Sequence, residues 1–394
     1  MSRLDELIEE LCPDGVEYKK IKQVYKRLKG TPITAGKMKE INNPYGEIRI
    51  FAGGKTVINA MEKDIPNANI TRVPAVLVQS RGVIDVVYYD KPFTFKNEMW
   101  AYTDDNTITV KYLYYVLKNN LSHFRKAASN MGSLPQISLP DTEEFVIPLP
   151  PLPVQQEIVR ILDNFTELTT ELKAEIEARK KQYDYYRDHL LTFDSSVSRM
   201  ALGEICTVQS GGTPQKANRE YWEKGTIKWL GSTVCKNQKT VDEVTDYISD
   251  LGLKNSSAKL MKKETTLIAL VGATIGKVAF LPFEAAINQN IAGIYPIDTT
   301  KLNPSYVYYA CGKLYKYFIG LSQGKLSMAN LSFVKGLKIP VPPLEEQERI
   351  VAILDRFDAL CNDPTSGLPA ELEARQKQYE YYRDKLLSFR EVSS

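Results

Sequence analysis

Histidine and cysteine are scarce in this chain of 394 residues, which contains two histidines and five cysteines. His123 and His189 lie in separate segments, and no cysteines show a C-x-x-C spacing or a neighbouring histidine. A zinc site needs several such ligands close together, and a histidine-based hydrolase needs a nucleophile and an acid near its base. We therefore expect free thiols in a reducing compartment, and neither metal nor redox chemistry.

Long apolar runs and an excess of one charge are also missing. No stretch of about 18 apolar residues occurs, so a transmembrane helix is not expected. The first residues, MSRLDELIEELCPDG, are acidic and lack an apolar core, which argues against a secretory signal and predicts a cytoplasmic protein without membrane contact. Because 51 basic residues nearly balance 48 acidic ones, any surface for nucleic acid must be local.

The chain contains a long internal repeat. Residues 147–165 read IPLPPLPVQQEIVRILDNF and residues 339–357 read IPVPPLEEQERIVAILDRF, at an offset of 192. Residues 175–193 (EIEARKKQYDYYRDHLLTF) match residues 371–389 (ELEARQKQYEYYRDKLLSF) at an offset of 196. The second copy therefore has four extra residues, within 361–370. These blocks predict a duplicated chain with two similar halves.

Each repeat predicts one long helix. Prolines hold the P-x-P-P-L start extended, and apolar residues then recur at spacings of three and four, which is typical of a coiled-coil seam. Pro364, Gly367 and Pro369 are expected to interrupt the second copy. A helix of about 40 residues spans roughly 60 Å, and we expect the two helices to pair antiparallel about a pseudo-twofold axis. The seam positions of the first copy are Ile158, Ile161, Phe165, Leu168 and Leu172.

The segments between the helices predict two globular domains of the mixed α/β (α+β) class. They hold short β-branched runs separated by turn residues, and each ends in an aromatic helical stretch. The two domains also share weaker sequence similarity. Residues 29–32 (KGTP) align with 211–214 (GGTP), and residues 112–115 (YLYY) align with 306–309 (YVYY). The expected division is a first domain at 1–146 with a short N-terminal helix, a spacer helix at 147–195, a second domain at 196–338 and a second spacer helix at 339–394.

Two short motifs suggest catalysis but are incomplete. Residues 272–277 (GATIGK) are one residue short of a P-loop, and Val278 stands where Ser or Thr would bind magnesium. Residues 42–45 (NNPY) lack the second proline of the N-P-P-Y box of adenine methyltransferases. Turns are the favoured interpretation of both. No paired carboxylates recur in the repeat, and no nucleophile stands beside a base, so no catalytic residue and no cofactor are expected.

Basic and amide residues occur in both halves in patterns typical of nucleic-acid binding, although a solvated lysine face is the alternative for any one cluster. Residues 18–30 (YKKIKQVYKRLKG) carry six basic residues and no acid. Lysine and arginine neutralise phosphates, whereas Asn, Gln and Arg read base edges. The expected phosphate contacts are Lys20, Lys26, Arg27, Lys29, Lys216, Arg219 and Lys228. The expected base-edge residues are Asn97, Gln136, Asn288, Gln289, Asn290 and Asn330. Further DNA-binding candidates in the repeated turn segments are Thr31, Arg81, Ser133, Gly212, Thr213, Lys277, Lys325 and Ser327.

With these blocks in view, the chain resembles the specificity subunits of type I restriction-modification enzymes. The resemblance rests on the tandem P-x-P-P-L…I-V-x-I-L-D-x-F and E-A-R-x-K-Q-Y-x-Y-Y-R-D-x-L-L blocks and on 211–214 (GGTP), and it covers nearly the whole chain. It implies two target recognition domains, each reading one half of a split sequence in double-stranded DNA. It also implies that the helices act as a spacer and dock two methyltransferase subunits, with restriction subunits joining the assembled complex, and that the subunit itself has no catalytic activity.

The first domain departs from the second at two places. It has Lys29 where the second domain has Gly211, and Pro135-Gln136 where the second has Ala329-Asn330. These differences leave the loop geometry of the first domain open. The alternative function is a coiled-coil scaffold whose two divergent domains bind proteins, and a methyltransferase or NTPase ranks third.

Overall fold

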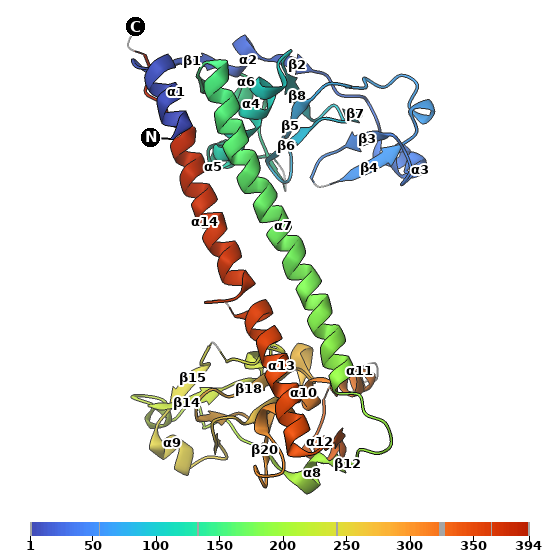
Figure 1. The fold of residues 1–394 in the computed structure, drawn as a ribbon, viewed down its shortest axis with the longest axis vertical. Coiled ribbons are helices and arrows are strands. Elements are labelled where there is room, and N and C mark those ends of the chain that lie inside the picture. Colours follow the sequence, from blue (N-terminus) through green and yellow to red (C-terminus); the bar gives the residue numbers. More distant parts are fainter. Residues whose placement is uncertain are drawn as a thin grey trace. The chain divides into compact units, whose positions relative to one another are not determined.

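The computed structural model describes residues 2–54, 56–131, 134–241, 243–322, 328–363 and 365–392. They form two compact units (Figure 1), the first from residues 1–171 and 373–394 and the second from residues 172–372. Each unit combines one mixed α/β domain with parts of both helical regions, so the predicted fold class is confirmed. Within the described residues, we find no helix with the length and apolar character needed to span a membrane.

The first unit contains an antiparallel sheet of four strands in the order β2-β8-β5-β6 and a sheet of three strands in the order β4-β3-β7, in which β3 and β7 run parallel. Two strand pairs, β1 with β11 and β9 with β10, complete it. The strands are β1 (Glu17–Lys20), β2 (Lys26–Leu28), β3 (Ile48–Phe51), β4 (Val57–Ala60), β5 (Ala75–Gln79), β6 (Asp85–Tyr89), β7 (Phe93–Phe95), β8 (Trp100–Thr103), β9 (Ser129–Met131), β10 (Leu134–Gln136) and β11 (Val146–Leu149). The helices are α1 (Arg3–Leu11), α2 (Ile21–Val24), α3 (Ala35–Ile41), η1 (Glu62–Asp64), α4 (Thr107–Asn119), α5 (Leu121–Ala127) and α6 (Leu139–Glu143).

The second unit has a similar topology, with a fourth strand, β16, in its second sheet. Its sheets have the orders β13-β20-β17-β18 and β15-β14-β19-β16, and β14 and β19 run parallel as β3 and β7 do. The strands are β12 (Arg199–Ala201), β13 (Cys206–Ser210), β14 (Ile227–Leu230), β15 (Asp246–Ile248), β16 (Lys259–Met261), β17 (Thr266–Ala269), β18 (Val278–Phe280), β19 (Ala285–Ile287), β20 (Ile291–Pro296) and β21 (Lys338–Pro340). The helices are α8 (Leu202–Ile205), η2 (Arg219–Tyr221), η3 (Ser232–Val234), α9 (Asp250–Lys254), η4 (Gly272–Thr274), α10 (Pro304–Gly312), α11 (Tyr315–Ser322) and α12 (Leu331–Gly336).

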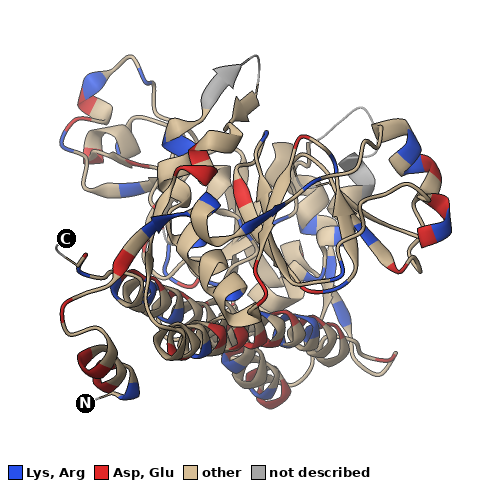
Figure 2. Ribbon diagram, turned by 90° about the horizontal axis from the view of Figure 1, so that it is seen from above, with Lys and Arg blue, Asp and Glu red and all other residues tan. Residues whose placement is uncertain are grey.

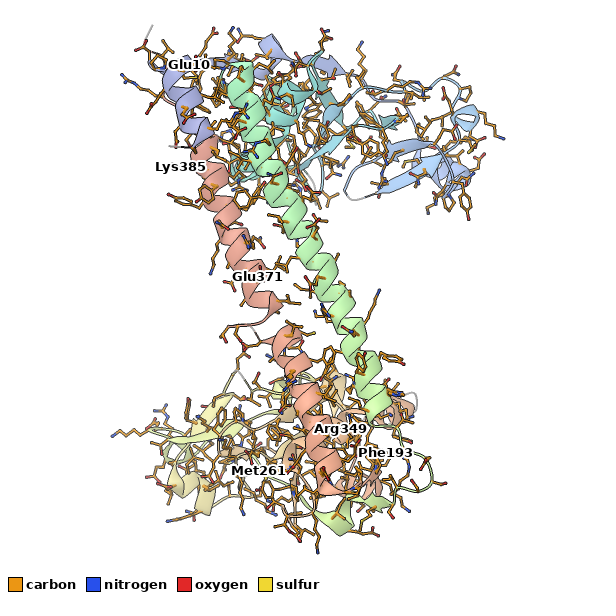
Figure 3. All side chains as sticks on the ribbon, in the orientation of Figure 1. Glu10, Phe193, Met261, Arg349, Glu371 and Lys385 are labelled. Carbon is orange, nitrogen blue, oxygen red and sulfur yellow. The ribbon has the colours of Figure 1, made fainter. Side chains whose placement is uncertain are left out.

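Apolar central strands build the cores. Every residue of β5 and β17 is buried, as expected for strands covered on both faces. Met261 lies among the packed side chains of the second unit (Figure 3). The aromatic helices α4 and α10 place Tyr112 and Tyr306 at equivalent positions, where their hydroxyls donate to the carbonyls of Pro148 (3.2 Å) and Pro340 (2.9 Å). The repeated tyrosines therefore hold the proline-rich exits that lead into the long helices.

The long helices are α7 (Leu152–Leu190), α13 (Leu344–Asn362) and α14 (Leu368–Leu386), so the expected interruption of the second copy is confirmed; Pro364 lies outside the described residues. In each unit a segment of α7 pairs antiparallel with a segment of the second copy (Figure 1). Phe165 stacks on Tyr382 in the first unit, and Phe357 stacks on Tyr186 in the second. Leu168, which the periodicity places in the seam, is 50% exposed, so that prediction is wrong.

The segment after α14 completes the first unit. The backbone N–H of Val16 donates to the Arg390 carbonyl (2.8 Å), and that of Val392 donates to the Val16 carbonyl (3.1 Å). The Tyr18 hydroxyl donates to the Phe389 carbonyl at 2.8 Å. Residues from the far end of the sequence therefore close a domain that begins near residue 16.

Candidate nucleic-acid interface

Segments that are distant in the sequence meet in the first unit. Thr31 pairs with Lys96 in a parallel bridge, and Arg81 pairs with Gln136 in an antiparallel bridge. Arg81 and Lys96 line one cleft of about 750 Å³. The structure thus brings together three of the expected site segments, around Thr31, Arg81 and Gln136. Other lining residues of the cleft are Lys39, Gly53, Gly54, Gly82 and Glu98.

The second unit brings its own expected residues together. The backbone N–H of Gly212 donates to the Ile287 carbonyl at 3.0 Å. The Thr213 hydroxyl donates to Oε1 of Gln289 at 2.8 Å. The turn after β13 and the turn after β19 are therefore adjacent, with the exposed Gln289 between them and solvent.

A third turn joins this cluster. The Leu270 N–H donates to the Asn290 carbonyl, and the Ala329 N–H donates to the Leu270 carbonyl, each at 2.8 Å. Asn330 follows as the N-cap of α12, where its side chain accepts from the Phe333 N–H at 2.8 Å. One cluster thus contains the half-buried Thr213 and Asn290 and the exposed Gln289 and Asn330.

Glycine allows the close approach of the repeated G-T-P turns. A Cβ on Gly212 would lie 1.9 Å from Oγ of Ser257, and a Cβ on Gly30 would lie 2.7 Å from the Phe95 carbonyl oxygen. At Gly211 a Cβ would lie 1.8 Å from the Ile287 carbonyl oxygen. Lys29, its counterpart in the first unit, is exposed, so the two turns differ in geometry at this position.

Three of the expected phosphate contacts in the basic segment 18–30 have carboxylate partners in the first unit, as do its Lys19 and Lys22. Hydrogen bonds from Lys20 and Lys22 lower the pKa of Glu144 to about 2. These cations are therefore partly neutralised, and their contact with phosphate stays a prediction, as does that of the exposed Lys29. The pairs are Lys20 with Glu144 (2.7 Å), Lys26 with Asp105 (2.7 Å) and Arg27 with Glu143 (3.4 Å).

The expected cations of the second unit are more available. Lys216 is exposed, and the Arg219 side chain is 86% exposed with Glu223 at 4.0 Å. Lys228 lies over the ring of Phe283, with its Nζ 3.6 Å from the centroid. Basic and acidic residues are interspersed along the ribbon, helices included (Figure 2).

Some of the expected contact residues are buried in the structure. Thr31, Gly212 and Asn288 are buried; the Thr31 hydroxyl meets that of Thr94 at 2.6 Å, and the Asn288 side chain accepts from the Asn290 N–H at 2.9 Å. The side chains of Thr31 and Asn288 bond within the turns and Gly212 carries no side chain, so a contact of these three residues with DNA stays a prediction. Asn97 is exposed in the turn between β7 and β8, and Lys277 is half-buried in the turn before β18. Ser133, Lys325 and Ser327 lie outside the described residues.

The incomplete catalytic motifs are turns, as expected. Residues 272–277 connect the antiparallel strands β17 and β18, and residues 42–45 form the turn after α3. All five cysteines are buried and free. In the part of the chain that the structure describes, no group of three or more histidine, cysteine or acidic residues could hold a metal ion.

The sequence did not single out Lys39, Lys96 and Glu98, which line the cleft of the first unit. Lys96 and Glu98 flank the predicted Asn97 and pair with each other at 3.0 Å. Their position next to an amide already assigned to the site was the available signal. Lys39 lies on α3 and carried no such signal.

Comparisons with known proteins agree with this architecture. Residues 13–179 and 195–374 match the family described as the type I restriction modification DNA specificity domain. The chain is 35% identical over 368 residues to the specificity subunit of the type I restriction enzyme EcoR124I/EcoR124II of Escherichia coli, covering 90% of this chain and 89% of that protein. A putative type I specificity subunit of Haemophilus influenzae is 33% identical, covering 75% of this chain and 77% of that protein.

A solved structure shares the fold. The S subunit of the type I restriction-modification system of M. genitalium superposes with a TM-score of 0.63 at 19% identity, covering 95% of this chain and 96% of that chain. The two stretches that match the DNA specificity domain define a protein with two DNA-recognition domains. The chain belongs to the specificity subunits of type I restriction-modification systems. This finding excludes a generic scaffold as the main function.

Proposed function

We propose that each recognition domain reads one half of a bipartite, asymmetric DNA target, and that the helices dock two methyltransferase subunits and set the gap between the half-sites. The recognition domains are assigned to residues 1–146 and 196–338, and the spacer helices to 147–195 and 339–394. The subunit performs no catalysis, and restriction subunits join it through the assembled complex in the cytoplasm. One observation carries the proposal: two units have similar topologies and nearly identical helical segments but differ in their polar turns.

Mapping methylated adenines tests this function. The chain is coexpressed with the methyltransferase subunit of its own system, and modified positions are mapped across the host genome. We expect a motif of two different half-sites separated by unread base pairs, because two rigidly linked modules on one duplex read separate segments. A continuous or palindromic motif would contradict the proposal.

Phosphate contacts and base contacts should give different salt responses. Replacing Lys216 with alanine should weaken binding on all sequences and reduce the magnitude of the salt slope by about one. Replacing Gln289 with alanine should cost roughly 1–3 kcal/mol on the cognate second half-site and relax discrimination there. Salt-titrated binding of the assembled complex measures both, with first half-site discrimination as the internal control. An unchanged salt slope for the lysine variant would identify Lys216 as part of a solvated face.

The long helices offer one repeated surface for the two methyltransferase subunits. Tyr185 in the second unit and Tyr381 in the first are both 64% exposed. Each packs edge-on against the following tyrosine, with interplanar angles of 75° in both cases. Exposed aromatic rings in an identical setting are typical of interface anchors. Two copies of one surface fit two copies of one partner.

Replacing either tyrosine should remove one docking site. For Tyr185→Ala or Tyr381→Ala, we expect binding of one methyltransferase subunit to weaken about 30-fold while the other binds normally, since anchor residues contribute about 2 kcal/mol or more. Calorimetric titration gives affinity and stoichiometry together. Tyr45→Ala is the matched control, because Tyr45 is 92% exposed in a turn that is not repeated. Two normal sites in both helix variants would place the docking surface elsewhere.

A further inference from the structure

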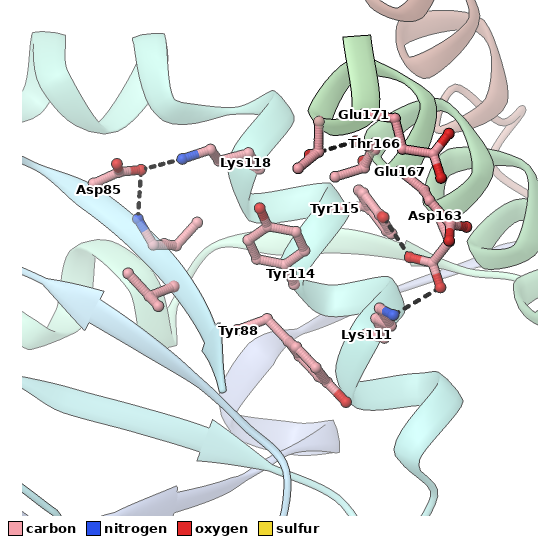
Figure 4. Close-up of a pocket in the computed structure, with 13 residues that line it drawn as sticks. Asp85, Tyr88, Lys111, Tyr114, Tyr115, Lys118, Asp163, Thr166, Glu167 and Glu171 are labelled. Carbon is pink, nitrogen blue, oxygen red and sulfur yellow. Dashed lines mark hydrogen bonds and ion pairs between the residues drawn. The ribbon is translucent and has the colours of Figure 1, made fainter. Parts of the chain in front are cut away.

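The aspartates of the two I-L-D-x-F repeats occupy the same place in the two units. In the first unit the Tyr115 hydroxyl donates to Oδ1 of Asp163 at 2.5 Å, and Nζ of Lys111 donates to Oδ2 at 2.7 Å (Figure 4). In the second unit the Tyr309 hydroxyl donates to Oδ1 of Asp355 at 2.5 Å. Each contact joins the aromatic helix of a recognition domain, α4 or α10, to a long helix.

The cation of this cluster comes from a different element in each unit. Lys111 stands on α4, but the second unit has Ser305 at the equivalent position of α10. There the ion pair with Asp355 is made by Lys239, which belongs to the segment between η3 and β15. Because the same charge recurs from an unrelated position, the arrangement is more than a remnant of the duplicated sequence.

The aromatic surroundings recur as well. Nζ of Lys111 lies 5.3 Å from the ring centroid of Tyr88, and Nζ of Lys239 lies 5.4 Å from that of Phe280. Tyr115 and Tyr309 are buried, and burial together with the bond to the aspartate raises their pKa values. Their hydroxyls therefore remain protonated donors. A buried hydroxyl without a partner is costly, so the aspartate is needed on the helix side.

We infer that Asp163 and Asp355 are positioning residues that fix the angle of each recognition domain on its long helix, and thereby the half-site spacing that the complex accepts. This inference rests on the proposed function. The apolar contacts of Ile158 and Leu162 hold α7 against the first domain, but apolar contacts have little directional preference. A carboxylate bonded by both a tyrosine hydroxyl and a lysine ammonium is directional; the two donors take separate oxygens of Asp163 and share Oδ1 of Asp355. Loss of these bonds should leave the recognition domain folded but its angle on the long helix less well defined.

Two lysines of α4 provide a matched comparison. Lys111 pairs with Asp163 on α7, whereas Lys118 pairs with Asp85 on β6 at 2.6 Å, inside the recognition domain (Figure 4). The exposures of the four side chains are similar, between 28% and 35%. Lys111→Met and Lys118→Met therefore remove comparable ion pairs, of which only the first reaches the long helix.

The experiment measures methylation by the assembled complex on DNAs whose gap is native, one base pair shorter or one base pair longer. For Lys111→Met, Asp163→Asn and Lys239→Met, we expect the preference for the native gap to fall by about fivefold, the size of a partly exposed ion pair, with half-site discrimination unchanged. Lys118→Met should keep the wild-type preference. Adding Ser305→Lys to Lys239→Met should restore it, because the cation then stands where the first unit has it.

The possible results distinguish a failure of this inference from a failure of the proposed function. Equal loss of rate on all three gaps, or equal effects of Lys111→Met and Lys118→Met, would mean that the cluster only stabilises the fold and would overturn the inference. A wild-type complex that ignores base changes in either half-site would instead overturn the proposed function. Because Lys111→Met leaves the bond between Tyr115 and Asp163 in place, it tests the inference even if Asp163→Asn does not fold.

Discussion

Gly211→Ala is expected to destabilise the second unit by about 2–3 kcal/mol or more, in the upper part of the range for overpacked sites. The added Cβ would lie 1.8 Å from the Ile287 carbonyl oxygen, a backbone atom that cannot rotate away. The turn after β13 must then leave β19, and the cluster around Gln289 opens with it. Second half-site discrimination should be lost as well, while the first half-site is read normally.

Denaturant unfolding followed by tryptophan fluorescence measures this change. Trp229 donates from its indole N–H to the Gly212 carbonyl at 3.0 Å, so it reports on the turn itself. Gly336→Ala is the matched control, because no heavy atom lies within 4 Å of its added Cβ. That variant should stay within about 0.5 kcal/mol of the wild type. Equal stability of the two variants would show that the G-G-T-P turn tolerates a side chain.

Four residues inserted after Thr170 are expected to lengthen the unread gap by about one base pair or slightly more. The insertion adds roughly 6 Å of helix, equal to nearly two base pairs at about 3.4 Å of rise each, and we expect only part of this length to lie along the DNA axis. The α7 helix is continuous there, with Leu162 in the core of the first unit and Ile176 buried further along. Both half-sites should keep their sequences, and the original gap should be modified at least about tenfold more slowly.

The matched insertion goes after Thr365, between α13 and α14, where the helix is already interrupted and a loop can absorb the added residues. Methylome mapping of both variants gives the gap directly. If the insertion in α7 leaves the gap unchanged, the helices do not determine the spacing. A changed gap for the loop insertion alone would assign the spacing to the second copy.

The long helices and the mixed α/β class followed from the sequence because their signals are local, whereas the strand order of the sheets did not. The spacing of Ile158, Ile161 and Phe165 and the prolines around residue 365 predicted α7 and the break before α14. Leu168 was misplaced because periodicity shows which residues share a helix face but not how far the partner helix extends along that face. The turn at residues 272–277 was predicted from an equally local signal, since this segment lacks one position of the P-loop motif.

The site was predicted less completely because it depends on contacts between distant turns. The contact of Thr213 with Gln289 and the bridge between Arg81 and Gln136 join residues that are distant in the sequence, so no local pattern predicted them. The sequence also did not predict which side chains of the site are buried. Thr31 and Asn288 are polar residues in turns, and only the packing in the structure shows that they point inward. The ion pair of Lys239 with Asp355 could not be predicted, because no local pattern connects Lys239 to the I-L-D-x-F repeat.

The closure of the first unit by residues 389–392 has a consequence for biosynthesis. The second unit is one uninterrupted stretch, 172–372, whereas the first is split between 1–171 and 373–394. During translation the second unit can therefore complete its contacts while the partners of Val16 and Tyr18 are still missing. Domains usually fold in the order in which the ribosome makes them. Here the first unit is the first to be synthesised in part and the last to complete its folding.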